Sequence, residues 1–178
     1  PIMIYLPSFR KKERQYSIFS GLKQSLVEAT KIRYMTRFLF ARMAYNDGLV
    51  TLFAFGGIYA AKVFNFSQLE IILFAICLNI SAGFGAMIGG YVDDSMGPLK
   101  TIKIGLIGLF LCGLVAIITP YKLLFWFVGI GLGLFVGPIQ SASRTYISLE
   151  ASDIYKGGLF GLYMVSGKLT SFIGPLLY

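Results

Sequence analysis

The chain has 178 residues, of which 56% are hydrophobic and only 13% are charged. Soluble domains are about 45–50% apolar and about 25% charged, so this composition excludes both a soluble globular domain and an intrinsically disordered chain. The net charge is +8 and histidine is absent, which excludes imidazole acid–base chemistry and histidine-ligated metals. Cys77 and Cys112 lie in apolar runs without metal-ligand spacing. The composition predicts an all-α, multi-pass membrane protein with no metal, cofactor or catalytic residue.

The first 37 residues form a segment of their own. Pro1–Pro7 has the character of the end of a preceding hydrophobic helix, and we expect the chain to be a fragment of a larger transporter. Ser17–Met35 carries apolar residues at three- and four-residue spacing, which predicts an amphipathic linker helix at the cytoplasmic interface. Eight of the sixteen basic residues fall here: Arg10, Lys11, Lys12, Arg14, Lys23, Lys31, Arg33 and Arg37. We interpret them as a lipid-touching cytoplasmic segment and not as a nucleic-acid site.

The remainder, residues 38–178, reads as a bundle of membrane-spanning helices, because a span needs roughly 20 mainly apolar residues. Five stretches qualify: about Phe38–Ala61, Leu69–Val92, Thr101–Thr119, Leu123–Ala142 and Gly158–Tyr178. The joints between them carry loop chemistry: Ser67 as an N-cap before Glu70, the turn residues Gly97 and Pro98 within Asp93–Lys100, the hairpin Thr119–Lys122, and the polar stretch Ser143–Gly157. Basic residues in alternate joints place the segment before the first span in the cytoplasm.

Several polar residues lie inside these spans, where a charge costs about 2.5–3.5 kcal/mol and therefore usually faces the protein interior. Arg42 and Asn46 share a helix face, whereas Asp47 lies about 140° from Arg42 and needs a partner on another helix. These residues are candidates for the solute or proton pathway; the alternative is an anchor at the inner membrane surface. Lys168, Asn79 and Gln140 are further candidates. The two amides are equally well explained as contacts between helices.

Glycines recur at small-xxx-small spacing, which allows helices to approach closely. The spacing occurs at Gly85–Gly89, Gly133–Gly137 and Gly157–Gly161. Gly129-Ile-Gly-Leu-Gly133 lacks the strand and the acidic residue of a dinucleotide site, so we exclude that interpretation. Gly137-Pro138 and Gly174-Pro175 predict kinks.

The joint after the second span carries the most specific motif, Gly90-Tyr-Val-Asp-Asp94-Ser-Met-Gly97-Pro-Leu-Lys100. It resembles the Gly-x-x-x-Asp-x-x-Gly-x-x-basic signature loop of the major facilitator superfamily, except that Ser95 replaces the usual basic residue. A carboxylate at a helix end can face the N-terminus of a neighbouring helix or pair with Arg144. We expect Gly90, Asp93, Asp94, Gly97 and Arg144 to form a cytoplasmic gate. The alternative is a turn with two solvated carboxylates.

Three further stretches resemble the vacuole effluxer branch of that superfamily: Ala41-Arg-Met-Ala-Tyr-Asn-Asp-Gly48, Gly133-Leu-Phe-Val-Gly-Pro-Ile-Gln-Ser-Ala-Ser-Arg144 and Phe160-Gly-Leu-Tyr-Met-Val-Ser-Gly-Lys168. The resemblance implies helices seven to eleven of a twelve-helix carrier, with an N-terminal six-helix half as partner. Eukaryotic members export amino acids from the vacuole, and bacterial members mostly have no assigned substrate. The membrane is then the bacterial inner membrane or the vacuolar membrane.

The sequence thus predicts a secondary active transporter of a small polar solute, such as an amino acid, that works by alternating access with a proton as a possible coupling ion. One alternative is a membrane-embedded solute sensor or scaffold that does not transport. The other is an intramembrane enzyme, which is disfavoured because the adjacent carboxylates Asp93 and Asp94 lie in a joint and not in a cavity.

Overall fold

The computed structural model describes residues 27, 29–32, 34–151 and 156–169. In this part of the chain, residues 27 and 29–31 are helical, and the structure gives the bounds of five helices: α2 (Met35–Phe64), α3 (Gln68–Met96), α4 (Pro98–Ile118), α5 (Lys122–Glu150) and α6 (Lys156–Leu169). The first four are long and apolar enough to cross a membrane. The predicted all-α membrane architecture is therefore present in the described residues as four candidate spans followed by α6.

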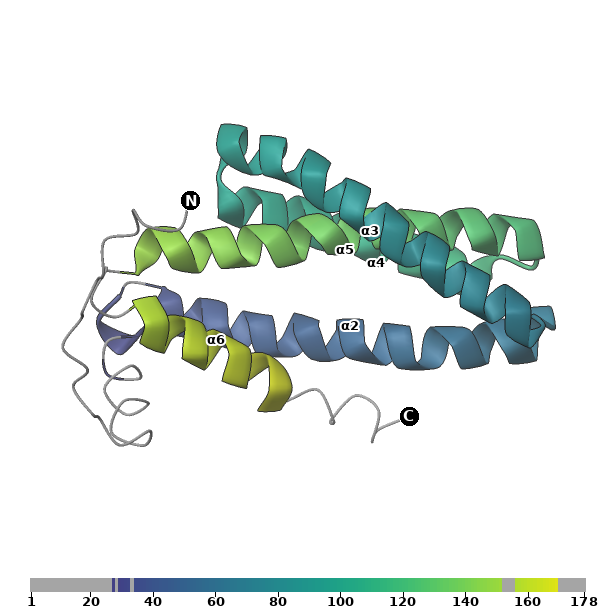
Figure 1. The fold of residues 1–178 in the computed structure, drawn as a ribbon, viewed down its shortest axis with the longest axis horizontal. Helices are drawn as coiled ribbons and strands as arrows, with labels where there is room; N and C mark the ends of the chain where they lie inside the picture. Colours follow the sequence, from purple (N-terminus) through teal and green to yellow (C-terminus); the bar gives the residue numbers. More distant parts are fainter. Residues whose placement is uncertain (1–26, 28, 33, 152–155, 170–178) are drawn as a thin grey trace, which may run out of the picture.

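The helices form two groups (Figure 1). Helix α5 packs mainly against α3 and α4, and α2 packs mainly against α6, while contacts between α2 and the three-helix group are sparse. Successive helices alternate in direction, so α3 and α5 run parallel to each other (Figure 1). We call the end with Met35, Gly97 and Glu150 the inner end, since the sequence predicts it to be cytoplasmic, and the end with Gln68 and Lys122 the outer end.

Glycine holds α3 and α5 close together, as two of the small-residue spacings predict. An added Cβ at Gly85 would lie 2.8 Å from the carbonyl carbon of Leu134, and one at Gly89 would lie 2.8 Å from Cα of Pro138. Distances below 3.0 Å leave no room for a side chain, so the backbones touch along this face. The third spacing is different, because a Cβ at Gly157 or Gly161 would meet no atom within 4 Å.

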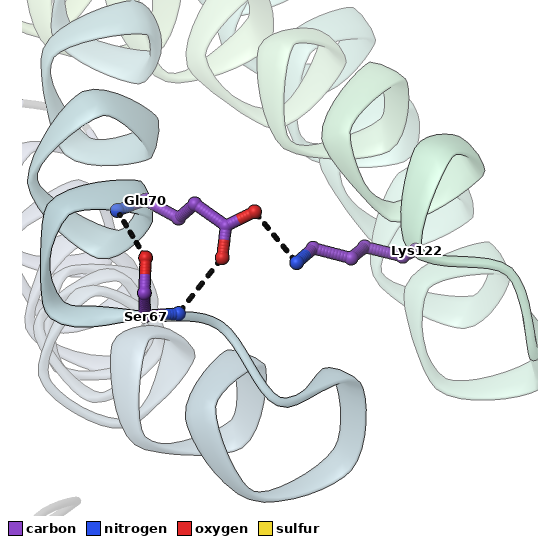
Figure 2. A network of polar contacts seen from close by, with 3 residues as sticks. All are labelled: Ser67, Glu70 and Lys122. Atoms are coloured by element: carbon purple, nitrogen blue, oxygen red, sulfur yellow. Dashed lines mark hydrogen bonds and ion pairs between the residues drawn. The ribbon is translucent and has the colours of Figure 1, made fainter.

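At the outer end, polar contacts join the start of α3 to the start of α5 (Figure 2). The Ser67 backbone N–H donates to Oε2 of Glu70 over 2.8 Å, and the Glu70 N–H donates to Oγ of Ser67 over 3.3 Å. This capping box confirms Ser67 as the predicted N-cap of α3. The other Glu70 oxygen lies 2.6 Å from Nζ of Lys122 at the start of α5. Aromatic rings pack beneath these groups: Phe64, Phe66, Phe74, Phe125 and Trp126.

At the inner end, two helices run further than predicted. Residues 93–96 continue α3 rather than forming a loop, and Gly97, with φ 84°, provides the break before Pro98 begins α4. Residues 143–150 continue α5, although their polar composition suggested a joint. Ser143, Tyr146 and Ile147 are buried. The segment is therefore amphipathic, and its buried stripe packs with residues of α2 and α6 in the inner core.

Some expectations fall outside the described residues. These include Pro1–Pro7, most of the predicted amphipathic linker, Gly174-Pro175, and the predicted fifth span beyond residue 169. Pro138 lies within α5, which continues past it as one helix.

Candidate functional site

Arg42 is the most constrained polar residue of the predicted set. It lies two turns into α2 and is 8% exposed. Its Nη1 donates to the backbone oxygen of Tyr163 over 2.9 Å and to Oγ of Ser166 over 3.3 Å. The guanidinium carbon lies 3.5 Å from the centre of the Tyr163 ring, which adds a cation–π contact. Because a Cβ at Gly167 would lie 3.1 Å from Cζ of Arg42, that glycine makes room for the guanidinium.

Two neighbours of Arg42 connect α2 to other helices. Asn46, one turn further along, donates from Nδ2 to the backbone oxygen of Gly167 over 2.8 Å. Arg42 and Asn46 therefore both reach α6, as their four-residue spacing predicts. Tyr45 instead contacts α5, where its hydroxyl lies 2.6 Å from Oγ of Ser143. The Ser143 hydroxyl donates to the Ile139 carbonyl, so Tyr45 donates to Ser143.

Two pockets adjoin this cluster. The α6-side pocket has a volume of about 410 Å³ and is lined by Arg42, Tyr45, Asn46, Gln140, Arg144, Phe160, Tyr163 and Met164. The α3-side pocket has a volume of about 440 Å³ and is lined by Phe53, Asn79, Ala82, Ala86, Val136, Gly137, Gln140, Ser141, Arg144 and Thr145. Gln140 and Arg144, four residues apart on α5, line both pockets.

A third pocket continues toward the outer end. This outer pocket has a volume of about 350 Å³ and a mainly apolar and aromatic lining that includes Tyr59, Phe74 and Phe125. It shares Phe53 and Asn79 with the α3-side pocket. The three pockets thus form a row beside α2 in which neighbouring pockets share lining residues, and the row is polar toward the inner end and apolar toward the outer end.

The structure brings most of the predicted pathway residues to this row. Arg42, Asn46, Asn79 and Gln140 line it, and so does Arg144, which the sequence assigned to the gate. Asn79 also donates to the Ala75 carbonyl of its own helix. Two candidates are not among the lining residues: Asp47 is partly buried and Lys168 is exposed.

The predicted gate residues lie near the inner end of α3. Asp93 is 7% exposed, and its Oδ1 is buried with no hydrogen-bond partner in the described residues. Asp94, which matches the signature loop, is exposed, and within the described chain it forms no ion pair with Arg144. Gly90 is partly buried, and Gly97 is the cap between α3 and α4. The separation of the two carboxylates into a buried and an exposed one follows from their adjacent positions on a helix that continues beyond them.

Sequence reasoning missed the hydroxyl groups of the site. The Ser166 hydroxyl accepts from Arg42, and the hydroxyls of Tyr45 and Ser143 contact each other nearby, whereas Tyr163 contributes its backbone oxygen and its ring. One signal was available: Tyr45 and Ser143 belong to the two stretches that also contain Arg42 and Arg144.

Comparisons with known proteins agree with the predicted family. The family model described as "Vacuole effluxer Atg22 like" matches residues 1–178. A Bacillus subtilis (strain 168) protein described as an uncharacterized MFS-type transporter, YxiO, is 28% identical over 170 residues, which cover 94% of this chain and 39% of that protein. The chain therefore spans well under half the length of this relative. No solved structure matches the chain.

Proposed function

Since the chain belongs to the Atg22-like vacuole effluxer family of major facilitator transporters, we propose that the whole protein is a secondary active transporter of a small polar solute that works by alternating access. Family membership makes it a multi-pass membrane protein of a transporter family and not an enzyme. We also propose that residues 38–178 form the C-terminal helical bundle of this transporter and that a cytoplasmic linker precedes the bundle. An N-terminal six-helix half would complete the carrier. Amino acids are the first solute class to test, and a proton is the first coupling ion.

The row of three adjoining pockets is the observation that carries this proposal. Alternating access requires a solute site that opens to one side of the membrane at a time, and the binding pockets of transporters lie between helices near the midplane. The pockets run beside α2 from Arg42 near the inner end to Phe74 near the outer end. Polar side chains of the membrane-spanning helices line these pockets. Such side chains are energetically unfavourable in contact with lipid, so they usually face the interior of the protein.

The inner gate belongs to the same proposal. The Asp94 carboxylate and the Arg144 guanidinium are both exposed and form no ion pair in the described conformation. An ion pair between them in the alternate conformation would hold that state closed. The buried Asp93 and the break at Gly97 would fix where the end of α3 lies.

Counterflow of labelled amino acids into proteoliposomes of the full-length protein tests the proposal. We expect uptake by the unaltered protein and a strong loss in Gln140→Leu, which replaces an amide shared by two pockets. Gln68→Leu is the matched control, because Gln68 is an exposed amide at the outer end of α3. Solute binding without counterflow would favour the sensor alternative. Unchanged counterflow in Asp47→Asn or Lys168→Ala would remove that residue from the pathway.

A further inference from the structure

The charged side chains that line the α6-side and α3-side pockets are all positively charged. Among the described residues that line the α6-side and α3-side pockets, Arg42 and Arg144 are the charged ones, and both are cations. Neither forms an ion pair within the described residues. A buried cation in a membrane-spanning helix without a counter-ion is costly, so an anionic group near these pockets would stabilise Arg42.

The two arginines differ in how they are held. Arg42 is buried and directed at α6 by the Tyr163 carbonyl, the Ser166 hydroxyl and the Tyr163 ring. Its Nε is buried with no hydrogen-bond partner in the described residues. Arg144 is exposed and has no hydrogen bond or ion pair in the described chain. Its donors are therefore available to a ligand in either pocket.

We propose that this half of the carrier binds the carboxylate group of the solute, with Arg144 as its ion-pair partner and Gln140 as a neighbouring hydrogen-bond donor. The proposal rests on the proposed transport function and deepens it. A guanidinium offers two parallel N–H donors that match the two oxygens of a carboxylate. Gln140 lies one turn away on the same face of α5 and borders the same two pockets. Arg42 contributes positive potential from a fixed position rather than a direct contact.

The α6-side pocket fits such a ligand in size and chemistry. Its volume of about 410 Å³ falls in the range of small-molecule sites, about 300–1,000 Å³. Beyond the arginines it offers the Asn46 amide and aromatic surface from Phe160. A carboxylate at Arg144 therefore leaves the rest of a small solute against both polar and apolar groups.

Ligand-induced thermal stabilisation of the full-length protein tests the proposal with matched solutes. The probes are alanine, glutamate, lactate and succinate, each compared with its carboxamide. We expect at least one carboxylate to raise Tm while its carboxamide does not. In Arg144→Gln the apparent affinity should fall by roughly tenfold or more, the usual effect of losing a charged hydrogen bond. Arg144→Lys should retain part of the apparent affinity, because lysine keeps the positive charge but lacks the two parallel N–H donors of the guanidinium.

Lys103→Gln is the control, because Lys103 is an exposed cation of α4 outside both pockets and its replacement should leave binding unchanged. Equal stabilisation by carboxamides, full binding in Arg144→Gln, or no stabilisation by any probe would overturn the proposal. If Arg144→Gln lowers Tm without ligand and leaves carboxylate preference unaltered, a carboxylate of the protein is the partner, which also overturns it. Counterflow separates the two proposals: carboxylate binding without counterflow contradicts only transport, whereas counterflow by the unaltered protein together with unchanged carboxylate affinity in Arg144→Gln contradicts this inference and leaves transport standing.

Discussion

Gly85→Ala should separate α3 from α5, because the two backbones touch at this position. The new Cβ would lie 2.8 Å from the carbonyl carbon of Leu134, and closer still to its oxygen. Ordinary contacts begin at 3.4 Å, so the helices must part by at least about 0.6 Å. Backbone atoms cannot rotate away as a flexible side chain can, and overpacking of this kind costs typically about 1–3 kcal/mol.

Gly83→Ala is the matched control, two residues away on the same helix, because a Cβ there would meet no atom within 4 Å. Both substitutions gain up to about 1 kcal/mol of helix propensity, so the difference between them isolates the steric cost. We expect thermal unfolding of the full-length protein in detergent to show a Tm several degrees lower for Gly85→Ala than for Gly83→Ala. Equal Tm values would refute the close packing of α3 and α5.

Three further outcomes are expected. Arg42→Lys should lower stability by about 1–3 kcal/mol, because an ammonium cannot stack flat on the tyrosine ring or keep the planar donor geometry; a Tm equal to that of the unaltered protein would contradict the contacts to α6. Lys122→Gln should cause a small loss of Tm in dilute buffer that disappears in high salt, because its ion pair with Glu70 is partly exposed and is screened; a loss that persists at high salt would point to another role. In a background without native cysteines, Lys100→Cys should react with a membrane-impermeant maleimide from the cytoplasmic side and Asn65→Cys from the opposite side; the reverse labelling would overturn the assigned orientation.

The sequence was informative about the membrane helices because apolar runs of sufficient length have few alternatives. It was less informative where a helix leaves the hydrocarbon region. Residues 143–150 are polar enough to resemble a loop, yet Ser143, Tyr146 and Ile147 repeat at three- and four-residue spacing and form a buried stripe. A periodicity test applied beyond the apolar run would have detected this extension of α5.

The candidate site also has some features that the sequence predicts and others that it does not. The shared face of Arg42 and Asn46 follows from their spacing, and the structure confirms it. Their acceptors were not predictable, because they are mostly backbone carbonyls of α6, and a carbonyl oxygen leaves no mark in the sequence. The place of Arg144 in two pockets was also hidden, since it depends on α5 continuing as a helix through that residue.

Helix α2 is held by contacts with neighbouring residues near both of its ends. Arg42 and Asn46 attach it to α6 near one end, and Ala60 and Phe64 embed it among aromatic rings near the other. Between these attachments it borders open space at Phe53. A solute that occupies this central space would bend α2. Because both ends of α2 are attached, this bending would change the forces on its contacts at both surfaces of the membrane.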